Sequence, residues 1–416
     1  MTVREEIQLL CDNASQAAAR LALADTQTKN DLLMRIADAL TGDCDTILAA
    51  NGEDQKNAAD NGVPDTMLDR LKLDAKRVEG IASSIRDIAQ LDDPVGTGEK
   101  WTRPSGIEIS RIRVPLGVVA IIYEARPNVT ADSAALCLKT GNAVVLRGGK
   151  EAINTNKAIV EVIKRVLDEC EIDPHSVELV TNTDRESAHA LMTMRGSVDV
   201  LIPRGGKGLI KSVVENATVP VIETGAGNCH LYVDDSADVD MAVSVAVNAK
   251  CSRPSVCNAI ETVLVHAGIA AKFLPALALA TSEFNVQLRG CPKTCVLVPD
   301  AVPATEEDYY TEYNDYILAV KVVDTVGDAI AHVNKYSTGH SEAIVTSTEE
   351  NAERFQKEVN SAAVYVNAST RFTDGGEFGF GAEIGISTQK LHVRGPMGLF
   401  ALTTEKYLVK GNGNVR

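Results

Sequence analysis

Apolar residues recur at spacings of three and four along the first part of the chain, which predicts amphipathic helices. This pattern covers residues 3–21, 29–40, 45–61 and 71–91. A loop rich in glycine and proline follows at 93–98, and residues 107–114 then have the character of an extended ribbon. We therefore expect a helical N-terminal part that leads into a β-ribbon.

From residue 115 the pattern changes, because short β-branched runs begin to alternate with helical stretches. Such alternation predicts a parallel sheet with helices on both faces. Ligands of these sheets bind at the carboxyl ends of the strands. The expected strands are 118–123, 143–146, 177–180, 198–202 and 219–222, and the expected helices are 129–139, 154–167, 185–194 and 208–216.

A second alternating set predicts a second α/β domain. Its expected helices are 239–250, 270–279, 326–334 and 349–358, and its expected strands are 260–266, 295–298, 317–323, 343–345 and 363–367. A last β-like piece covers 399–404. The pattern thus predicts an α/β protein of two domains with ribbon elements.

Composition narrows the class of protein. Hydrophobic residues make up 45% and charged residues 24%, which is ordinary for a globular chain, and the formal net charge is −16. That charge disfavours binding to nucleic acid or to an anionic membrane. No apolar run is long enough to span a bilayer, and the N-terminus lacks the pattern of a signal peptide. We expect the cytoplasm.

The nine cysteines form neither a paired framework nor a metal site. They are odd in number, and none has a histidine or cysteine partner at zinc-ligand spacing. We expect no metal, mostly reduced and buried thiols, and one thiol that is reactive.

Three glycine-rich stretches follow predicted strands, and the first two also carry cations. Glycines let the backbone approach a phosphate, and helix N-termini attract one. None of the stretches matches G-x-G-x-x-G, so each either binds a phosphate or forms a tight turn. The candidate cofactor-binding residues are Arg147, Gly148, Gly149, Lys150, Arg204, Gly205, Gly206, Lys207 and Gly225.

Residues 250–258 lie between a predicted helix and a predicted strand and contain Cys257. Lys250 and Arg253 would supply positive potential there, and Pro254 enforces an irregular backbone. A thiol in such a setting is shifted toward thiolate. Cys257 is therefore the candidate nucleophile, and the alternative is a structural thiol.

Four long segments resemble one enzyme family. They are 115–129, with Y-E-A-R-P-N-V at 123–129; 252–259, which reads S-R-P-S-V-C-N-A; 326–344; and 374–388. In these segments, and from about residue 3 to 414, the chain resembles the γ-glutamyl phosphate reductases of the aldehyde dehydrogenase superfamily. The resemblance implies an aldehyde dehydrogenase-like α/β fold with a Rossmann-like cofactor domain, a catalytic α/β domain and a small β oligomerisation element.

On this basis residues 1–232 are expected to form the cofactor-binding domain. Its sheet starts at about 115, and its ribbon at 104–114 belongs to the oligomerisation element. Residues 233–368 are expected to form the catalytic domain with Cys257. Residues 369–416 would supply a substrate-mouth segment and an oligomerisation tail.

The family's activity is NADPH-dependent reduction of L-glutamyl 5-phosphate to L-glutamate 5-semialdehyde, in proline biosynthesis, through a thioester on the nucleophile that Cys257 matches. The resemblance also implies a homo-oligomer. No kinase segment precedes the matched region, so a separate glutamate 5-kinase is the expected functional partner.

The resemblance also suggests roles for single residues. Asn128 is the candidate oxyanion donor after a shift of two positions against the wider superfamily, with a turn residue as the alternative. Glu223 matches the general base of hydrolytic relatives. Arg147 and Lys150 match positions that contact the adenosine ribose, and a lysine where NAD-preferring relatives place an acid favours NADP. Arg253 is a candidate for the phosphate, and Arg371 and Asp374 for the rest of the substrate.

Two other functions stay open. Glu223 would suit a hydrolytic aldehyde dehydrogenase that oxidises a semialdehyde to the acid. The chain could also be a non-catalytic cofactor-binding member of the fold.

Overall fold

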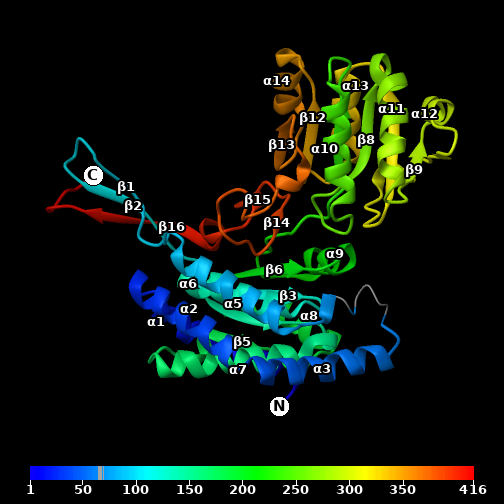
Figure 1. Cartoon of the computed structure of the whole chain (residues 1–416). Helices are drawn as coiled ribbons and strands as arrows, with labels where there is room; N and C mark the ends of the chain where they lie inside the picture. Colours follow the sequence, from blue (N-terminus) through cyan, green and yellow to red (C-terminus); the bar gives the residue numbers. More distant parts are fainter. Residues whose placement is uncertain (64–67, 69) are drawn as a thin grey trace. The chain divides into compact units, whose positions relative to one another are not determined.

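The computed structural model describes residues 1–63, 68 and 70–416. The chain divides into two compact units (Figure 1). Unit 1 comprises residues 1–223, 379–385 and 397–416, and unit 2 comprises residues 224–378 and 386–396. The predicted boundary at 232 lies inside β7 (Cys229–Val233), a strand of the unit 2 sheet. In the structure, the chain passes from unit 1 to unit 2 after Glu223 instead.

Unit 1 is built on a four-stranded parallel sheet in the order β5-β4-β3-β6. The strands are β3 (Val118–Tyr123), β4 (Ala143–Arg147), β5 (Val177–Leu179) and β6 (Val200–Arg204). Every residue of β3 is buried, because helices cover both faces. The predicted strand at 219–222 is reduced to an isolated bridge between Leu201 and Val221.

The helices of unit 1 form layers on this sheet. One apolar cluster joins α1 and α8 to β3 and β4 through Ile7, Leu191, Ala120 and Val145. Helices α6 and α7 pack on β4 and β5, and α2, α3 and α5 pack on α6 and α7. The helices are α1 (Val3–Leu21), α2 (Thr26–Gly42), α3 (Cys44–Asp60), α5 (Ala75–Gln90), α6 (Pro127–Lys139), α7 (Ile153–Glu169), α8 (Arg185–Met192) and α9 (Lys207–Asn216).

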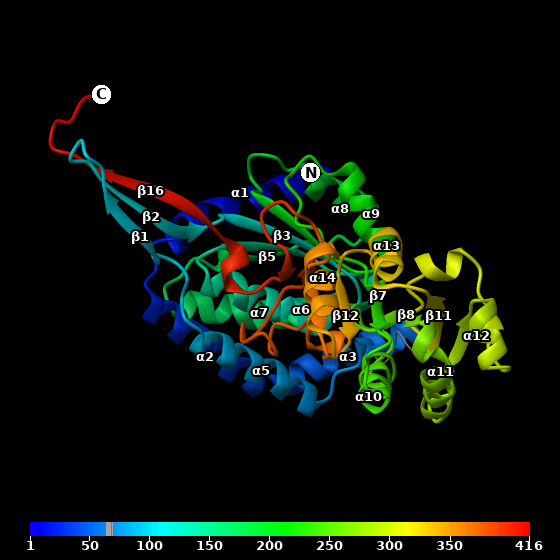
Figure 2. The ribbon, with the colours of Figure 1, turned by 90° about the horizontal axis from the view of Figure 1, so that it is seen from above.

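Unit 1 also carries an antiparallel three-stranded sheet in the order β1-β2-β16, which we call the arm (Figure 2). Its strands are β1 (Gly98–Thr102), β2 (Glu108–Pro115) and β16 (Thr403–Lys410). The ribbon predicted at 107–114 is β2. Only Thr403 among the residues of these strands is buried.

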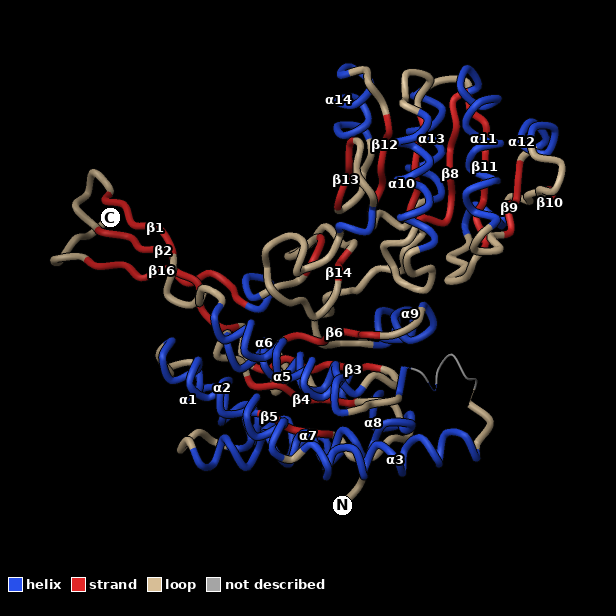
Figure 3. The backbone as a smooth tube through the Cα atoms, in the orientation of Figure 1, coloured by secondary structure: helices blue, strands red, loops and turns tan. Residues whose placement is uncertain are grey.

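Unit 2 is built on a seven-stranded parallel sheet in the order β10-β9-β11-β8-β7-β12-β13 (Figure 3). The strands are β7, β8 (Ile260–His266), β9 (Gln287–Gly290), β10 (Val302–Pro303), β11 (Ile317–Val323), β12 (Ser341–Val345) and β13 (Ala363–Val366). Residues Ile386–Ser387 (β14) and Gly395–Pro396 (β15) form a separate short pair.

Two apolar clusters hold helices to the sheet of unit 2. One contains Ala242, Ala246, Phe273 and Leu277 of α10 and α11, and the other contains Ile330 and Phe355 of α13 and α14. The helices are α10 (Val239–Cys251), α11 (Ala267–Ser282), α12 (Pro292–Leu297), α13 (Val326–Tyr336) and α14 (Glu349–Glu358). The predicted strand at 295–298 is wrong, because these residues end helix α12.

Two features concern the chain as a whole: the state of its cysteines and the apolar character of its helices. All nine cysteines are free, four of them buried and five half-buried. Among the described residues, no helix combines the length and the apolar character that a membrane span requires.

Candidate active site

Cys257 lies in unit 2 in the turn that connects α10 to β8, and it is half-buried. Its carbonyl oxygen accepts a hydrogen bond from the Sγ of Cys229 at 3.2 Å. The backbone of Gly227 packs so closely against this turn that a Cβ at position 227 would lie 1.6 Å from the same oxygen. The turn that carries the candidate nucleophile therefore rests directly on the segment that leads into β7.

Asn258, the next residue, ties this turn to a 3₁₀ turn, η4 (Thr370–Phe372). Its side-chain amide donates to the carbonyl oxygens of Arg371 at 3.2 Å and Thr373 at 3.0 Å. Its own carbonyl oxygen accepts from the Oγ1 of Thr370 at 2.6 Å. Asn258 is only 5% exposed, so these bonds are shielded from water. Sequence reasoning missed Asn258, although its place beside Cys257 was a usable signal.

The structure brings the predicted substrate residues to the same corner of unit 2. The Nε of Arg371 donates to the Oγ of Ser252 at 3.2 Å, and its Nη1 donates to the Oδ1 of Asn258. Burial and the nearby Arg253 charge lower the pKa of Arg371, while Asp374 and Cys257 act in the opposite direction. Arg253, Arg371, Asp374 and Cys257 therefore share one electrostatic environment.

Lys250 does not supply the positive potential that the sequence suggested. Its side chain is buried and forms an ion pair with Glu261 at 2.5 Å. Burial raises the pKa of Glu261, and the Lys250 charge opposes that shift. Because the two charges cancel, Lys250 serves the packing of α10 on β8 and leaves little field for Cys257.

The glycine-rich stretches after β4 and β6 gather at the carboxyl edge of the unit 1 sheet, where such sheets bind ligands. A Cβ on Gly148 would lie 2.3 Å from the Nδ2 of Asn156, and a Cβ on Gly205 would lie 2.6 Å from the Glu124 side chain. The Nδ2 of Asn156 is buried and has no hydrogen-bond partner among the described residues. Glycine is therefore required at both positions by close packing against these side chains, and the unpartnered amide nitrogen of Asn156 is a polar group available to a ligand at this edge.

Glu124, which sequence reasoning missed, belongs to this edge. It follows β3 directly, and its Oε2 accepts from the backbone N–H of Gly206 at 3.1 Å. Gly206 is the residue before α9, and Lys207 is the first residue of that helix. The N-terminus of α9 therefore already has a carboxylate next to one of its N–H groups.

The two cations after β4 have different environments. The Nη2 of Arg147 donates to the carbonyl oxygens of Thr183 at 2.5 Å and Asp184 at 3.1 Å, which fixes the loop after β5. Burial lowers the pKa of Arg147. Lys150 is exposed, and no ion pair of Lys150 is recorded within the described chain. Of the two, Lys150 is the better placed to meet a ligand.

The remaining predicted residues occupy different units. Asn128 is exposed at the start of α6, and its Nδ2 donates to the Oδ2 of Asp132 at 3.1 Å. Glu223 is half-buried at the end of the first segment of unit 1. Gly225 belongs to unit 2, where its N–H donates to Ile386 at 2.9 Å, whereas the other predicted cofactor residues belong to unit 1.

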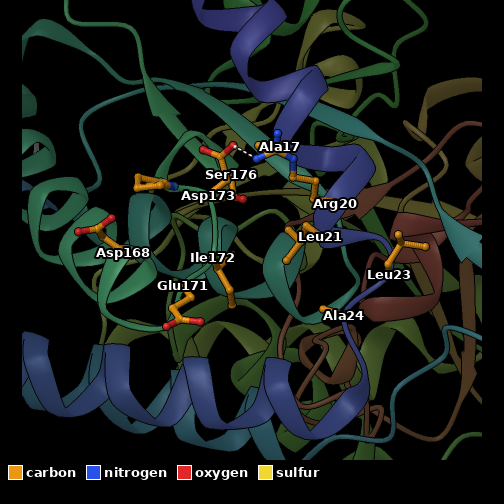
Figure 4. A pocket seen from close by; sticks show the side chains of 11 residues that line it. Ala17, Arg20, Leu21, Leu23, Ala24, Asp168, Glu171, Ile172, Asp173 and Ser176 are labelled. Atoms are coloured by element: carbon orange, nitrogen blue, oxygen red, sulfur yellow. Dashed lines mark ion pairs between the residues drawn. The ribbon is translucent and has the colours of Figure 1, made fainter.

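A pocket of about 580 Å³ on unit 1 lies outside this arrangement (Figure 4). It is bordered by the end of α1 and by the residues before β5, which is the amino edge of the sheet. Arg20 and Asp173 form an ion pair across it at 3.6 Å. The glycine-rich loops lie at the opposite edge, so we assign this pocket no part in the candidate site.

Comparisons with known proteins show the family to which the chain belongs. The model of the aldehyde dehydrogenase family matches residues 2–296 and 298–384. The γ-glutamyl phosphate reductase of Clostridium perfringens is 57% identical over 415 residues, covering 100% of both chains. That of Caldanaerobacter subterraneus is 54% identical over 412 residues, covering 99% of this chain and 100% of the relative.

Solved structures give the same result. The crystal structure of γ-glutamyl phosphate reductase from Thermotoga maritima superposes with a TM-score of 0.97 at 50% identity, covering 99% of this chain and 100% of the other. An acetylating aldehyde dehydrogenase from Geobacillus thermoglucosidasius superposes with a TM-score of 0.72 at 15% identity, which supports the fold alone.

Proposed function

Because the chain belongs to the aldehyde dehydrogenase family and, within it, to the γ-glutamyl phosphate reductases, we propose that it reduces L-glutamyl 5-phosphate to L-glutamate 5-semialdehyde with NADPH and releases phosphate. The observation that carries this proposal is identity of 54–57% with such reductases over their whole length. The Cys257 turn adds support, because it presents a half-buried thiol on a backbone held from both sides.

The chemistry starts at an acyl phosphate, which is already activated. The thiolate of Cys257 attacks the γ-carbonyl carbon, phosphate leaves with the electrons of the broken C–O bond, and a thioester remains. The N–H of Cys257 and the amide of Asn128 are the proposed donors to the oxyanion, a contribution of about 10² to 10³ in rate per donor. When bound, NADPH supplies the hydride that reduces the thioester, and the sulfur is released as the aldehyde forms.

The substrate's charges suggest roles for the remaining residues of unit 2. Arg253 is exposed beside Cys257 and is the proposed contact for the phosphate group. Arg371 and Asp374 have opposite charges and are proposed to face the α-carboxylate and the α-amino group of the glutamyl chain. The cofactor is assigned to the carboxyl edge of unit 1, with Lys150 toward the 2′-phosphate and the glycines of 148–149 and 205–206 next to the pyrophosphate.

The proposed cellular setting follows from the same family. The arm is assigned to contacts with other copies of the chain, so the protein is expected to be a homo-oligomer. A separate glutamate 5-kinase would supply the unstable acyl phosphate. The free thiols suit a reducing compartment, and the cytoplasm is the proposed location.

The reverse reaction tests the proposal. NADPH formation from glutamate 5-semialdehyde and NADP⁺ is measured while phosphate is titrated from zero. We expect saturable dependence on phosphate, with arsenate able to substitute, because phosphate must attack the thioester to release the product from Cys257. Sustained turnover to glutamate without phosphate would instead favour a hydrolytic dehydrogenase with Glu223 as the base. Absence of any turnover would favour a non-catalytic member of the fold.

A further inference from the structure

Arg371 is anchored to both ends of the segment that carries Cys257. Its Nε donates to Ser252, five residues before the nucleophile, and its Nη1 donates to Asn258, one residue after it. A guanidinium is a planar fork, so two anchors on different residues fix its position and its orientation. The positive charge is therefore held along the Cys257 turn and is not free to point into solvent.

The backbone of Arg371 is attached to the same turn. Asn258 donates to the carbonyl oxygens of Arg371 and Thr373, and Thr370 donates to the carbonyl oxygen of Asn258. The side chain and the main chain of Asn258 therefore both form hydrogen bonds with η4 or with Thr373, the residue after it. Because Asn258 is 5% exposed, breaking these bonds would leave buried polar groups unpaired, which is unfavourable. We therefore expect the turn that carries Cys257 and η4 to move together.

Several other titratable groups near this corner are neutral, paired or hydrogen-bonded. Burial keeps the pKa of Cys229 well above its usual value, so this thiol stays neutral. Glu261 is paired with buried Lys250, and buried Glu342 accepts from the backbone N–H of His230 at 2.7 Å. The exposed Asp374 carboxylate partly offsets the Arg371 charge, as its effect on the pKa of that guanidinium shows.

The two arginines differ in how strongly water screens them. Arg253 is exposed, whereas Arg371 is half-buried. A charge in a less polar environment acts more strongly over the same distance. A negative charge on Cys257 would oppose the lowering of the Arg371 pKa that burial causes.

Accepting Cys257 as the nucleophile, on which this inference rests, we infer that Arg371 stabilises the thiolate form of Cys257 and that Asn258 and Ser252 position Arg371 for this task. The thiol proton is released to solvent before the acyl phosphate arrives. No neighbouring base then has to accept that proton during the attack. This role goes beyond the substrate contact proposed for Arg371 above and explains why its side chain is turned back onto the loop.

The test measures the alkylation rate of Cys257 by iodoacetamide against pH, with peptide mass spectrometry to follow this cysteine among the nine. In Arg371→Met we expect the apparent pKa of Cys257 to rise by about one unit or more. The rate at pH 7 then falls about tenfold, while the limiting rate at high pH is unchanged. Arg371→Lys should give a smaller rise. Arg354→Met removes an exposed arginine of α14 and serves as the matched control, with no expected shift.

The positioning residues are tested in the same assay. Ser252→Ala removes one anchor from an exposed residue without disturbing the core, and we expect a rise of the Cys257 pKa smaller than that in Arg371→Met. Asn258→Ala should give a larger rise, and thermal unfolding shows whether that variant is folded. If Asn258→Ala does not fold, Ser252→Ala decides the point.

The outcomes separate this inference from the proposed function. If Cys257→Ala is inactive while Arg371→Met keeps the wild-type alkylation profile, the role of Arg371 is refuted and the reductase assignment stands. A rise in KM alone for Arg371→Met would make it a substrate contact only. If Cys257→Ala still forms the semialdehyde, the nucleophile itself is wrongly assigned.

Discussion

Gly227 shows how closely two backbones approach each other behind the candidate nucleophile. A Cβ at this position would lie 1.6 Å from the carbonyl oxygen of Cys257 and 2.5 Å from its Cα, far inside van der Waals contact. The N–H of Gly227 also donates to the Oε1 of Glu312 at 2.7 Å, so the backbone cannot easily retreat. At this position glycine is required by the lack of space, because only a hydrogen fits there.

Gly227→Ala should therefore displace the Cys257 turn. We expect kcat to fall at least tenfold and the free energy of unfolding to fall by about 1–3 kcal/mol, the usual cost of overpacking. The matched control is Gly52→Ala in the exposed part of α3, where a new Cβ meets nothing within 4 Å. That control should gain about 0.5–1 kcal/mol. Steady-state kinetics and urea unfolding of both variants check the prediction, and an active Gly227→Ala enzyme would contradict it.

Lys150 carries the prediction about cofactor preference. Arg147 is occupied by the carbonyl oxygens of Thr183 and Asp184, so the exposed Lys150 is the cation that remains for a 2′-phosphate. Lys150→Glu should shift the ratio of kcat/KM for NADPH and NADH toward NADH by at least tenfold, because a carboxylate repels the phosphate and can bind a ribose hydroxyl. Lys76→Glu on α5 is the charge-matched control. An unchanged ratio in Lys150→Glu would refute the role.

Asp132 is an ionisable group whose buried environment opposes its charge. Its Oδ1 is buried without a hydrogen-bond partner among the described residues, and its Oδ2 accepts from Asn128. Burial raises the pKa of Asp132 to about 6, against weaker lowering by Asn128, Ser84 and Arg204. The folded state thus prefers the neutral acid, so the contribution of Asp132 to stability is lost as pH rises from its unfolded pKa through 6.

Asp132→Asn should stabilise the protein at pH 8 by about 1–3 kcal/mol, because the amide does not have to ionise in a buried place. At pH 5.5 the gain should be smaller by about 1 kcal/mol. Urea unfolding at the two pH values measures the difference, with the exposed Asp31→Asn as the control. A gain independent of pH would show that the carboxyl is not the cause.

At the residue scale, the sequence singled out charged and reactive side chains but not the contacts that hold them in place. Cys257, Arg253, Arg371 and Asp374 were proposed from their charge, their loop positions and the family resemblance. The structure places all four in one electrostatic environment, and their roles stay predictions. The tie through Asn258 was missed, because contacts between residues more than a hundred positions apart leave no local pattern. Lys250 was misjudged, because its partner Glu261 lies on β8 and only burial brings the two together.

Among the elements, long periodic segments were predicted well and short ones less so. Helix α1 and strands β3, β8 and β11 have the bounds that the pattern predicted. Strand β7 was missed, because its sequence C-H-L-Y-V contains a single β-branched residue, whereas the predicted strands were recognised by β-branched runs. Helix α12 was taken for a strand, because a short apolar run cannot distinguish the two. Pro292 at its first turn was the signal that favoured a helix.

Helix α11 contains a proline in its interior, which leads to a prediction for this element. Pro275 lacks the N–H that would bond to the carbonyl four residues earlier, and its ring crowds that carbonyl. The residue is exposed, so no core packing depends on its ring. Pro275→Ala should raise the free energy of unfolding by about 1–3 kcal/mol. Thermal unfolding monitored by circular dichroism measures it. A neutral or destabilising result would mean that the proline contributes to the packing of α11 on β8 and β11.

For the molecule as a whole, the sequence predicted two α/β units but not how the chain alternates between them. Unit 1 receives residues 379–385 and 397–416 after the chain has completed most of unit 2. Long-range strand pairing determines where the chain returns to unit 1, because β16 pairs with β2 across nearly three hundred residues. Local periodicity carries no information about such partners, so the predicted third segment at 369–416 could not be divided correctly from the sequence.

The arm presents an apolar row on one face. Trp101 and Val409 both pair with Ile109 of β2, so the three side chains lie next to each other on the same face of the sheet. Val409 is 59% exposed, and Tyr407 on the same face is 55% exposed. Exposed apolar rows of this kind are typical of surfaces that bind another protein, and under the proposed function the occupant is a second copy of the chain.

Val409→Lys should therefore lower the molar mass measured by light scattering after size-exclusion chromatography, because a lysine ammonium in the apolar row would lose its hydration in the interface. Leu408→Lys, which alters the next residue and therefore the opposite face of the arm, is the matched control and should leave the mass of the assembly unchanged. Thermal unfolding of both variants separates loss of assembly from loss of folding. A monomeric wild-type protein would refute the assignment of the arm. Dissociation caused by Leu408→Lys but not by Val409→Lys would move the contact to the other face, where Leu408 lies beside Ser110 and Lys100.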